Sequence, residues 1–421
     1  MVSQSSESKH LLVIEDSKNV AQVIEHIGVS LGYRVTIATS FAVVKQLLAL
    51  KHDFFLATID YSLPDALDGE VIPYVLEHRI PGIVMTGRMD DKTRGKILNL
   101  PVVDYITKEN TQAYHYLLRI LKYQLTNNEI GVLVVDDSLT ARKQVCQLLK
   151  RRNFKVYDVP DGTKALQALT QFPDIKMVIT DQEMPGMDGI ELLQKIRKQH
   201  TKNELIVIGI SGTSKNYNSA RFIKNGADDF LQKPFCPEEF YCRIMQNIEK
   251  LQHIEEIERA ANTDYLTSLY NRRYFFEQAK KIAKKFKKTP EPSLLVMLDI
   301  DFFKKINDSY GHDCGDHVLI ELGKLFGQYF ANDLVARLGG EEFSIIMSAP
   351  DAELMACHLN TFREAVAEHA ISFKEHNFNF ALSMGAIQID AEHSIEQLMS
   401  LADKALYKAK EGGRNQLVMH R

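Results

Sequence analysis

Several features that would assign this chain to a membrane, secreted or metal-binding class are missing. No run of about 18 apolar residues occurs and Met1 to Lys9 is polar, so we expect no membrane span, no export and a cytoplasmic location. The net charge of -4 argues against a nucleic-acid partner. The cysteines show neither CxxC nor Cys/His spacing, which predicts reduced, buried thiols rather than disulfides or zinc at Cys146, Cys236, Cys242, Cys314 and Cys357.

The first two thirds of the sequence contain the same pattern twice. Apolar strands ending on Glu15-Asp16 and Asp136-Asp137 are each followed by a strand ending on an aspartate, Asp60 and Asp181, and both offsets are 121 residues. Strands ending on a hydroxyl and then on a lysine come next, both 125 residues apart, at Thr86 and Ser211 and at Lys108 and Lys233. In a chain of 421 residues this ordered repeat predicts a tandem domain duplication.

Each copy alternates short apolar strands with helical stretches, such as residues 141–150 and 189–197, which predicts an α/β fold with a parallel sheet wrapped by helices. The special residues all fall at carboxyl ends of strands, where such sheets bind ligands. An acid pair and a third aspartate meeting there would bind Mg²⁺ and allow one carboxylate to attack a phosphoryl donor. The hydroxyl and the lysine would hold the phosphate oxygens.

This constellation resembles the receiver domain of response regulators, over roughly residues 9–125 and 130–250. For the second copy the resemblance implies an Mg²⁺ pocket at Asp136 and Asp137 and a phosphoacceptor at Asp181. The switch residues would be Ser211, Lys233 and the aromatic Phe230. In the first copy, Glu15, Asp16, Asp60, Thr86, Lys108 and Tyr105 take the same places. The implied fold is flavodoxin-like, and the implied partner is an upstream histidine kinase or phosphotransfer protein.

The first copy departs from this pattern in three ways. One extra residue lies between Pro64 and Gly69, and Glu109 replaces the proline after the lysine. The interval from Asp60 to Thr86 is 26 residues, against 30 between Asp181 and Ser211. We expect the shortening in the third helix region, which carries Pro73. Phosphorylation is expected at Asp181 and is chemically possible at Asp60.

A long helix without glycine or proline is predicted over residues 238–262. Apolar residues recur at steps of three or four at Tyr241, Ile244, Ile248, Leu251, Ile254, Ile257 and Ala261. This pattern favours a stalk that makes a dimer contact over a merely exposed helix. The predicted organisation is residues 1–127 and 128–250 for the two copies, 251–262 for a helical linker and 263–421 for a third domain.

The third domain centres on a glycine turn followed by carboxylates. Gly339-Gly340 lies between two apolar runs and predicts a β-hairpin that carries Glu341 and Glu342. Taken alone, this is also the pattern of an ordinary exposed hairpin. A buried strand over residues 294–298 ends on Asp299-Ile300-Asp301, which again suggests a cation site. We also expect a strand over residues 378–389, a terminal helix ending at Gly412, and a helix whose apolar face carries Val318, Leu319, Leu322, Leu325 and Phe326. The lysines of residues 280–288 are interpreted as a solvated helix face.

Five motifs in order make residues 263–421 resemble the GGDEF-type diguanylate cyclase domain: Asp299-x-Asp-x-Phe-Lys304-x-x-Asn307-Asp308, Gly311-His312, Gly315-Asp316, Arg337-x-Gly-Gly-Glu-Glu-Phe343 and Lys410-x-x-Gly-Arg414-Asn415. The resemblance implies a ferredoxin-like α+β fold and a homodimer in which two GTP become cyclic di-GMP. It assigns Mg²⁺ to Asp299, Glu341, Glu342 and the Ile300 carbonyl, with Glu341 able to help deprotonate the hydroxyl. Guanine recognition falls to Asn307 and Asp316, which favours GTP over ATP, and the phosphates to Lys304, Lys410 and Arg414 beside Gly339 and Gly340.

One feature of that family is absent. Its product-inhibition site uses Arg-x-x-Asp, and here the stretch is Phe330-Ala-Asn-Asp333, so feedback through that site is doubtful. The function predicted from these resemblances is a response regulator with diguanylate cyclase output. The alternative is a catalytically idle adaptor that binds nucleotide or partner proteins.

Overall fold

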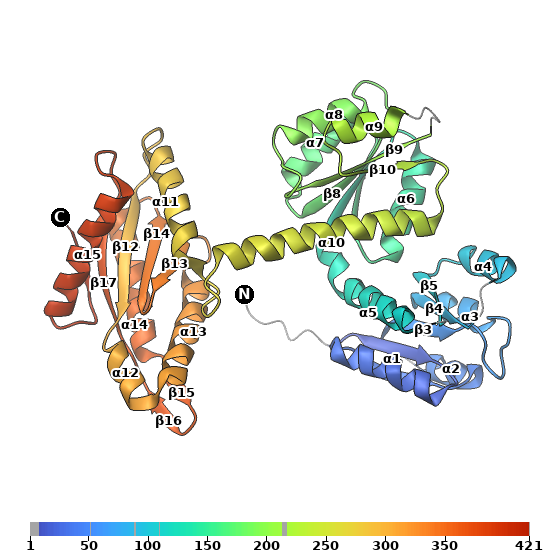
Figure 1. Cartoon of the computed structure of the whole chain (residues 1–421), viewed down its shortest axis with the longest axis horizontal. Coiled ribbons are helices and arrows are strands. Elements are labelled where there is room, and N and C mark those ends of the chain that lie inside the picture. Colours follow the sequence, from blue (N-terminus) through green and yellow to red (C-terminus); the bar gives the residue numbers. More distant parts are fainter. Residues whose placement is uncertain (1–7, 51, 88–89, 109, 213–216, 421) are drawn as a thin grey trace. The chain divides into compact units, whose positions relative to one another are not determined.

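The computed structural model describes residues 8–50, 52–87, 90–108, 110–212 and 217–420. The chain forms two compact units, residues 2–252 and residues 253–421. Figure 1 shows the helices and strands of each. Glu109, one of the three departures of the first copy, and the first seven residues of the polar N-terminal segment lie outside the described residues.

The first copy is a parallel five-stranded sheet with the strand order β2-β1-β3-β4-β5. Its strands are β1 (His10–Ile14), β2 (Arg34–Ala38), β3 (Phe54–Asp60), β4 (Gly82–Thr86) and β5 (Asp104–Thr107). Its helices are α1 (Lys18–Ser30), α2 (Phe41–Leu48), α3 (Val71–Glu77), α4 (Asp91–Leu98) and α5 (Thr111–Thr126), and the short 3-10 helix η1 (Asn127–Glu129) follows.

The second copy has the same topology, with the order β7-β6-β8-β9-β10. Its strands are β6 (Gly131–Val135), β7 (Lys155–Val159), β8 (Ile175–Asp181), β9 (Ile206–Ser211) and β10 (Asp229–Gln232). Its helices are α6 (Leu139–Arg151), α7 (Gly162–Gln171), α8 (Gly189–Arg197), α9 (Tyr217–Lys224) and α10 (Pro237–Asn262). The predicted doubly wound parallel sheets are confirmed in both copies.

Both sheets are buried on both faces, which is why their strands are almost entirely apolar. In the first copy, Leu11 and Val13 pack against α1 and α5, whereas Leu12 and Ile14 pack against α2, α3 and α4. The second copy repeats this division, with α6 and α10 on one face and α7, α8 and α9 on the other. The strand ends are thereby held in fixed register at one edge of each sheet.

The predicted shortening of the first copy falls in the third helix and in the connection that follows it. Helix α3 has seven residues, whereas the corresponding α8 has nine, and the connection to the next strand spans residues 78–81 in the first copy and 198–205 in the second. Pro73 is the third residue of α3, within the first turn, where a backbone N–H would have no helical partner.

The predicted long helix is confirmed as α10, which begins at Pro237, one residue earlier than expected. Its apolar stripe is buried as far as Leu251. Beyond that point Ile254 is half-buried and Ile257 is exposed. The expected dimer contact of this second half of the helix stays a prediction.

Residues 253–421 form a six-stranded mixed sheet with the order β11-β13-β14-β12-β17-β18. Its strands are β11 (Tyr270–Asn271), β12 (Ser293–Ile300), β13 (Leu334–Gly339), β14 (Glu342–Ser348), β17 (Leu382–Gln388) and β18 (Leu417–Met419). Its helices are α11 (Arg272–Phe286), α12 (Phe303–Tyr310), α13 (His312–Tyr329), α14 (Ala352–Glu368) and α15 (Ile395–Glu411). Helices α12, α13 and α14 cover one face, and α11 and α15 cover the other. The α+β prediction is confirmed.

The single strand predicted over residues 378–389 is wrong. The chain forms two strands there: β16 (His376–Phe378) pairs with β15 (Ile371–Phe373) in a separate two-stranded sheet, and β17 joins the main sheet. The break falls at Asn379, whose side chain donates a hydrogen bond to the Ala367 carbonyl, and at Phe380, which is buried. These two anchors turn the chain between the sheets.

All five cysteines carry free thiols, but the expectation that they are buried holds only for Cys146 and Cys314. Cys236, Cys242 and Cys357 are exposed: Cys236 lies in the loop before α10, and Cys242 and Cys357 lie at outward-facing positions of α10 and α14. No helix among the described residues is long and apolar enough to span a bilayer.

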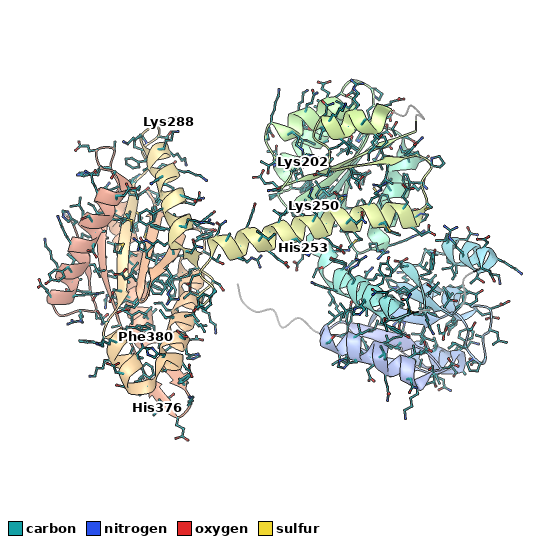
Figure 2. The ribbon with its side chains drawn as sticks, in the orientation of Figure 1. Lys202, Lys250, His253, Lys288, His376 and Phe380 are labelled. Carbon is teal, nitrogen blue, oxygen red and sulfur yellow. The ribbon has the colours of Figure 1, made fainter. Side chains whose placement is uncertain are left out.

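The lysine-rich segment behaves as a solvated face. Lys280 and Lys285 are exposed and form ion pairs with Glu396 and Glu291 at 3.2 and 3.7 Å. Lys288, labelled in Figure 2, follows the end of α11. Pairs of this kind are screened by solvent and contribute little stability.

Candidate active site and acidic pockets

The predicted glycine hairpin is present between β13 and β14, which pair antiparallel. Gly339 and Gly340 have φ angles of 150° and 54°, in the region that favours residues without a Cβ. The Arg337 side chain donates from Nε to the Gly340 carbonyl at 2.9 Å and from Nη1 to Asp264 at 3.1 Å. The turn is thus held from its own strand, and nothing within 4 Å would occupy the place of a Cβ at either glycine.

Two of the predicted carboxylate ligands lie on neighbouring strands, and the third, Glu341, lies in the turn itself. Asp299 of β12 is directly opposite Glu342 of β14, and the Ile300 amide donates to the Glu341 carbonyl at 3.4 Å. Burial raises the pKa of Asp299, and the charges of Glu341 and Glu342 add to this effect although Lys410 opposes it. A cation would relieve this concentration of negative charge.

The predicted phosphate cations lie in different surroundings. Lys410, in the last turn of α15, contacts Asp299 Oδ1 at 2.8 Å. The Arg414 guanidinium lies 4.4 Å from the centre of the Phe302 ring. Lys304 is an exposed residue of α12 without an ion pair among the described residues. The structure therefore brings Lys410 to the carboxylates, whereas Lys304 is free to reach toward a ligand.

The predicted guanine readers lie on α12 and α13. Asn307 Oδ1 is buried and has no hydrogen-bond partner among the described residues. A Cβ placed on Gly315 would lie only 1.9 Å from that oxygen, so glycine is required beside it. Asp316, the next residue, is exposed. A buried amide oxygen without a partner fits a site that a hydrogen-bond donor of a ligand completes.

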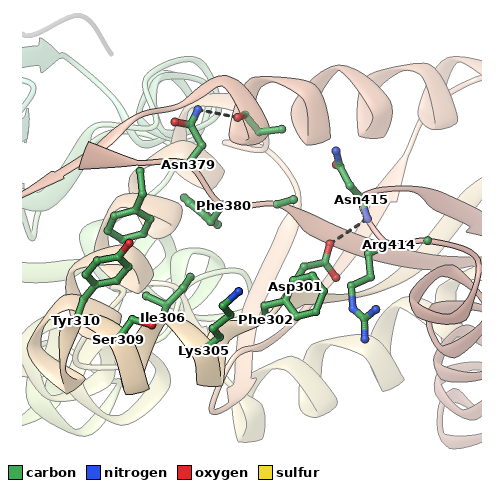
Figure 3. A pocket seen from close by; sticks show the side chains of 14 residues that line it. Asp301, Phe302, Lys305, Ile306, Ser309, Tyr310, Asn379, Phe380, Arg414 and Asn415 are labelled. Atoms are coloured by element: carbon green, nitrogen blue, oxygen red, sulfur yellow. Dashed lines mark hydrogen bonds between the residues drawn. The ribbon is translucent and has the colours of Figure 1, made fainter. Parts of the chain in front are cut away.

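A cavity of about 510 Å³ adjoins this region and is shown in Figure 3. Asp301, Phe302, Lys305 and Arg414 line one part of it, and Tyr310 and Phe378 stack with ring centres 4.7 Å apart in another. The sequence pointed to Asp301 as an acid at a strand end without assigning it a role. In the structure it is buried and accepts hydrogen bonds from Ser383 and Asn415.

The acidic pocket of the first copy is assembled at the carboxyl edge of its sheet. Lys108 Nζ donates to Glu15 at 2.6 Å and to Asp60 at 2.7 Å. Oxygens of Glu15, Asp16 and Asp60 all lie within 4.8 Å of one another, which suits a divalent cation. Burial raises the pKa of Glu15, although Lys108 opposes this effect.

The second copy repeats the lysine bridge. Lys233 Nζ donates to Asp136 at 2.8 Å and to Asp181 at 2.6 Å. Burial raises the pKa of Asp181 in spite of the ion pair. Asp137 is exposed, and within the described ranges no three-carboxylate group as tight as that of the first copy forms here. In each copy the lysine thus holds two carboxylates in place. Among the described residues, only the first copy brings a third carboxylate, Asp16, within the same distance.

The predicted switch residues follow the same strands. Thr86 and Ser211 are buried at the ends of β4 and β9. Phe230 packs against Phe222 of its own copy, with ring centres 5.6 Å apart. Tyr105 instead donates from its hydroxyl to Glu238 of α10 at 3.1 Å, where Arg94 also donates at 2.6 Å. Sequence patterns carried no signal for this contact between the two copies.

Comparisons with known proteins agree with this arrangement. Residues 261–416 match the family "Diguanylate cyclase, GGDEF domain", and residues 132–245 match "Response regulator receiver domain". A crystal structure of a two-component system response regulator/GGDEF domain protein is 33% identical, with a TM-score of 0.53, and the match covers 58% of this chain and 100% of that one. This chain belongs to the response regulators that carry a GGDEF domain.

Curated relatives include a response regulator and a diguanylate cyclase. Response regulator PleD of Caulobacter vibrioides is 30% identical over 302 residues, covering 68% of this chain and 65% of PleD. A diguanylate cyclase of Vibrio cholerae is 38% identical over 170 residues, covering 40% of this chain and 52% of that protein. The chain thus spans about two thirds or less of the length of these relatives.

The matched ranges contain the site residues of the GGDEF domain and those of the second copy, which is a receiver domain. The first copy lies outside both matched ranges and shares the receiver topology through its sheet order. In the GGDEF domain, Phe330 is buried and packs against Phe326, Phe362 and His358. Burial raises the pKa of Asp333, and His358 opposes this effect.

Proposed function

We propose that this response regulator converts two GTP into cyclic di-GMP and two pyrophosphates, and that phosphorylation of its receiver domains raises the rate. The observation that carries this proposal is the glycine turn flanked by Asp299, Glu341 and Glu342, with Lys410 held against Asp299. An idle adaptor has no need for an aspartate whose pKa is raised by burial and, to a smaller extent, by two neighbouring carboxylates.

The carboxylate set suits Mg²⁺, because oxygen ligands and accumulated negative charge are what this ion prefers. Asp299, Glu341 and Glu342 would hold it, with the Ile300 carbonyl as a further ligand. When bound, the ion would withdraw charge from the triphosphate and from the leaving pyrophosphate. Lys410 would then release Asp299 and join Lys304 and Arg414 on the phosphate oxygens.

The chain's own groups account for recognition and proton transfer. The Asn307 amide and the Asp316 carboxylate match the acceptor and donor edges of guanine, and Asn307 Oδ1 is a buried acceptor without a partner among the described residues. Glu341 would accept the proton of the 3′-hydroxyl as its oxygen attacks the α-phosphorus of the other GTP. One P–O bond forms and the bond to pyrophosphate breaks in each of the two steps.

The proposed active form is a homodimer, because one glycine turn binds one GTP and each reaction needs two. The exposed second half of α10, including Ile257, is the proposed dimer contact. Residues 251–262 would link the receivers to the cyclase domain of residues 263–421.

The first copy, residues 1–127, is proposed as a second receiver domain beside that of residues 128–250. Support comes from its identical sheet order and from the bridge of Lys108 to Glu15 and Asp60. A histidine kinase or phosphotransfer protein would phosphorylate Asp181 and Asp60, with Mg²⁺ held by Asp136 and Asp137 and by Glu15 and Asp16. Thr86 with Tyr105, and Ser211 with Phe230, would transmit the change.

Purified full chain incubated with GTP and Mg²⁺, with and without acetyl phosphate, tests the proposal. We expect cyclic di-GMP in both conditions and a higher rate with the phosphodonor. Because Phe330 takes the place of the inhibitory arginine, added cyclic di-GMP should leave the rate unchanged. Absence of product in both conditions would overturn the cyclase proposal in favour of an adaptor.

A further inference from the structure

The segment that follows α15 presents Arg414 from an unusual backbone. Gly413, Arg414 and Asn415 have φ angles of 115°, 64° and 43° in succession. Residues with a Cβ avoid this region, and asparagine tolerates it better than arginine does. A backbone of this kind persists only where surrounding contacts hold it.

Asp301 provides the first of these contacts, as the dashed line in Figure 3 marks. Its Oδ2 accepts a hydrogen bond from the Asn415 amide at 2.9 Å, and its Oδ1 accepts one from the Ser383 hydroxyl at 2.6 Å. Its own amide donates to the Ala381 carbonyl at 2.9 Å. The side chain is only 6% exposed, so it cannot exchange these partners for water.

Arg363 of α14 holds the same residue from another side. Its Nη1 donates to the Asn415 carbonyl at 3.1 Å and to Asn415 Oδ1 at 2.9 Å. The Asn415 main chain is therefore fixed at both its amide and its carbonyl. The guanidinium of the neighbouring Arg414 lies over the exposed Phe302 ring. Phe302 follows the end of β12 and is three residues beyond Asp299, the partner of Lys410.

We propose that Asp301 is a positioning residue for GTP: by bonding the Asn415 amide it sets Arg414 beside the site of the triphosphate. This inference rests on the proposed cyclase function and deepens it. A carboxylate suits the role because both donors need an acceptor oxygen. A leucine of nearly the same shape offers no acceptor to either donor, whereas an asparagine could keep both bonds by turning its NH₂ group to the Ser383 hydroxyl oxygen.

The test is a double-mutant cycle of Asp301→Leu and Arg414→Ala in the full chain, read as KM and kcat for GTP. Alone, Asp301→Leu should raise KM about tenfold with kcat changed by less than about twofold, because binding rather than chemistry is lost. In the Arg414→Ala background the same change should alter KM by less than about twofold, because the group it positions is gone. Equal effects in both backgrounds would overturn the proposal.

Ser383→Ala is the matched control. It removes the other hydrogen bond of Asp301 and leaves the bond to Asn415. We expect a lower melting temperature with an unchanged KM, whereas a KM as high as that of Asp301→Leu would contradict the positioning role. Should Asp301→Leu fail to fold, Arg363→Ala releases Asn415 from its other side and should raise KM about threefold, again only when Arg414 is present.

Binding of 3′-deoxy-GTP, which lacks the attacking hydroxyl, separates this inference from the proposed function. A wild-type protein that binds this analogue but makes no cyclic di-GMP from GTP refutes the cyclase proposal. The Kd for the analogue then replaces KM in the same double-mutant cycle. A wild-type protein that binds no analogue refutes both.

Discussion

Helix α13 contains a built-in test of the predicted guanine site, because its glycines differ in what surrounds them. A Cβ on Gly315 would lie 1.9 Å from Asn307 Oδ1, 3.0 Å from Asn307 Cγ and 3.2 Å from the Phe303 ring. A Cβ on Gly327 of the same helix would meet nothing within 4 Å. Gly315→Ala and Gly327→Ala are thus the same chemical change with and without a collision.

The expected magnitudes follow from these distances. Alanine in place of a helical glycine stabilises by about 1 kcal/mol, which should appear in full for Gly327→Ala. At Gly315, overpacking costs about 1–3 kcal/mol and offsets that gain. Asn307 must retreat by roughly 1.5 Å to restore a normal contact, and a displacement of even about 1 Å can lower catalytic efficiency by about 10²-fold, or about 2.7 kcal/mol.

Steady-state formation of cyclic di-GMP by the two variants, with thermal unfolding alongside, provides the assay. Gly315→Ala should lose about 10²-fold in kcat/KM for GTP while its melting temperature changes little. Gly327→Ala should keep its activity and melt higher. Equal kcat/KM for the two variants would show that Asn307 does not read the substrate.

Three further predictions test the other groups. The pKa of Asp299 in the folded protein is raised from its ordinary value of 3.8, so ionising this group destabilises the fold. This destabilisation is absent below pH 3.8 and develops as pH rises through the folded pKa. Asp299→Asn should therefore raise the melting temperature of the metal-free chain at pH 7.5 but not at pH 4, and abolish cyclase activity; a lower melting temperature at pH 7.5 would contradict this. Intact mass after acetyl phosphate treatment should show up to about two phosphoryl groups per chain, about one in Asp181→Asn or Asp60→Asn and none in the double variant. A wild-type chain that accepts a single group, lost in Asp181→Asn but kept in Asp60→Asn, would refute a role for Asp60. Tyr105→Phe should destabilise residues 2–252 by about 1 kcal/mol, and by much less in a Glu238→Ala background that lacks the acceptor oxygen, when unfolding is followed by hydrogen exchange. Additive losses would argue against the contact between the copies.

Much of the site was predictable because its residues lie at the ends of regular elements. Carboxyl ends of parallel strands meet at one edge of a sheet, so the spacing of Glu15, Asp60 and Lys108 along the chain was sufficient to predict their contact. The glycine hairpin followed in the same way from a local turn signal between two apolar runs. Periodicity likewise located α10 to within one residue.

Other features depend on partners that no local pattern records. Phe378 to Ile389 has the composition of one strand, and only the anchoring of Asn379 to Ala367 divides it between two sheets. The exposure of Cys236 reflects which side of the fold its segment faces rather than its apolar character.

Residue types, spacing and periodicity were enough to establish the duplicated sheets, the acidic strand ends and the hairpin, because each depends on interactions within one element or between adjacent ones. Folding alone decided the roles of Asp301 and Glu238. Asp301 meets Asn415 across 114 residues, and Tyr105 meets Glu238 across 133. Hydrogen bonds at such separations depend on how whole elements pack, and that is set by the combined burial of many side chains rather than by the few residues that form the contact.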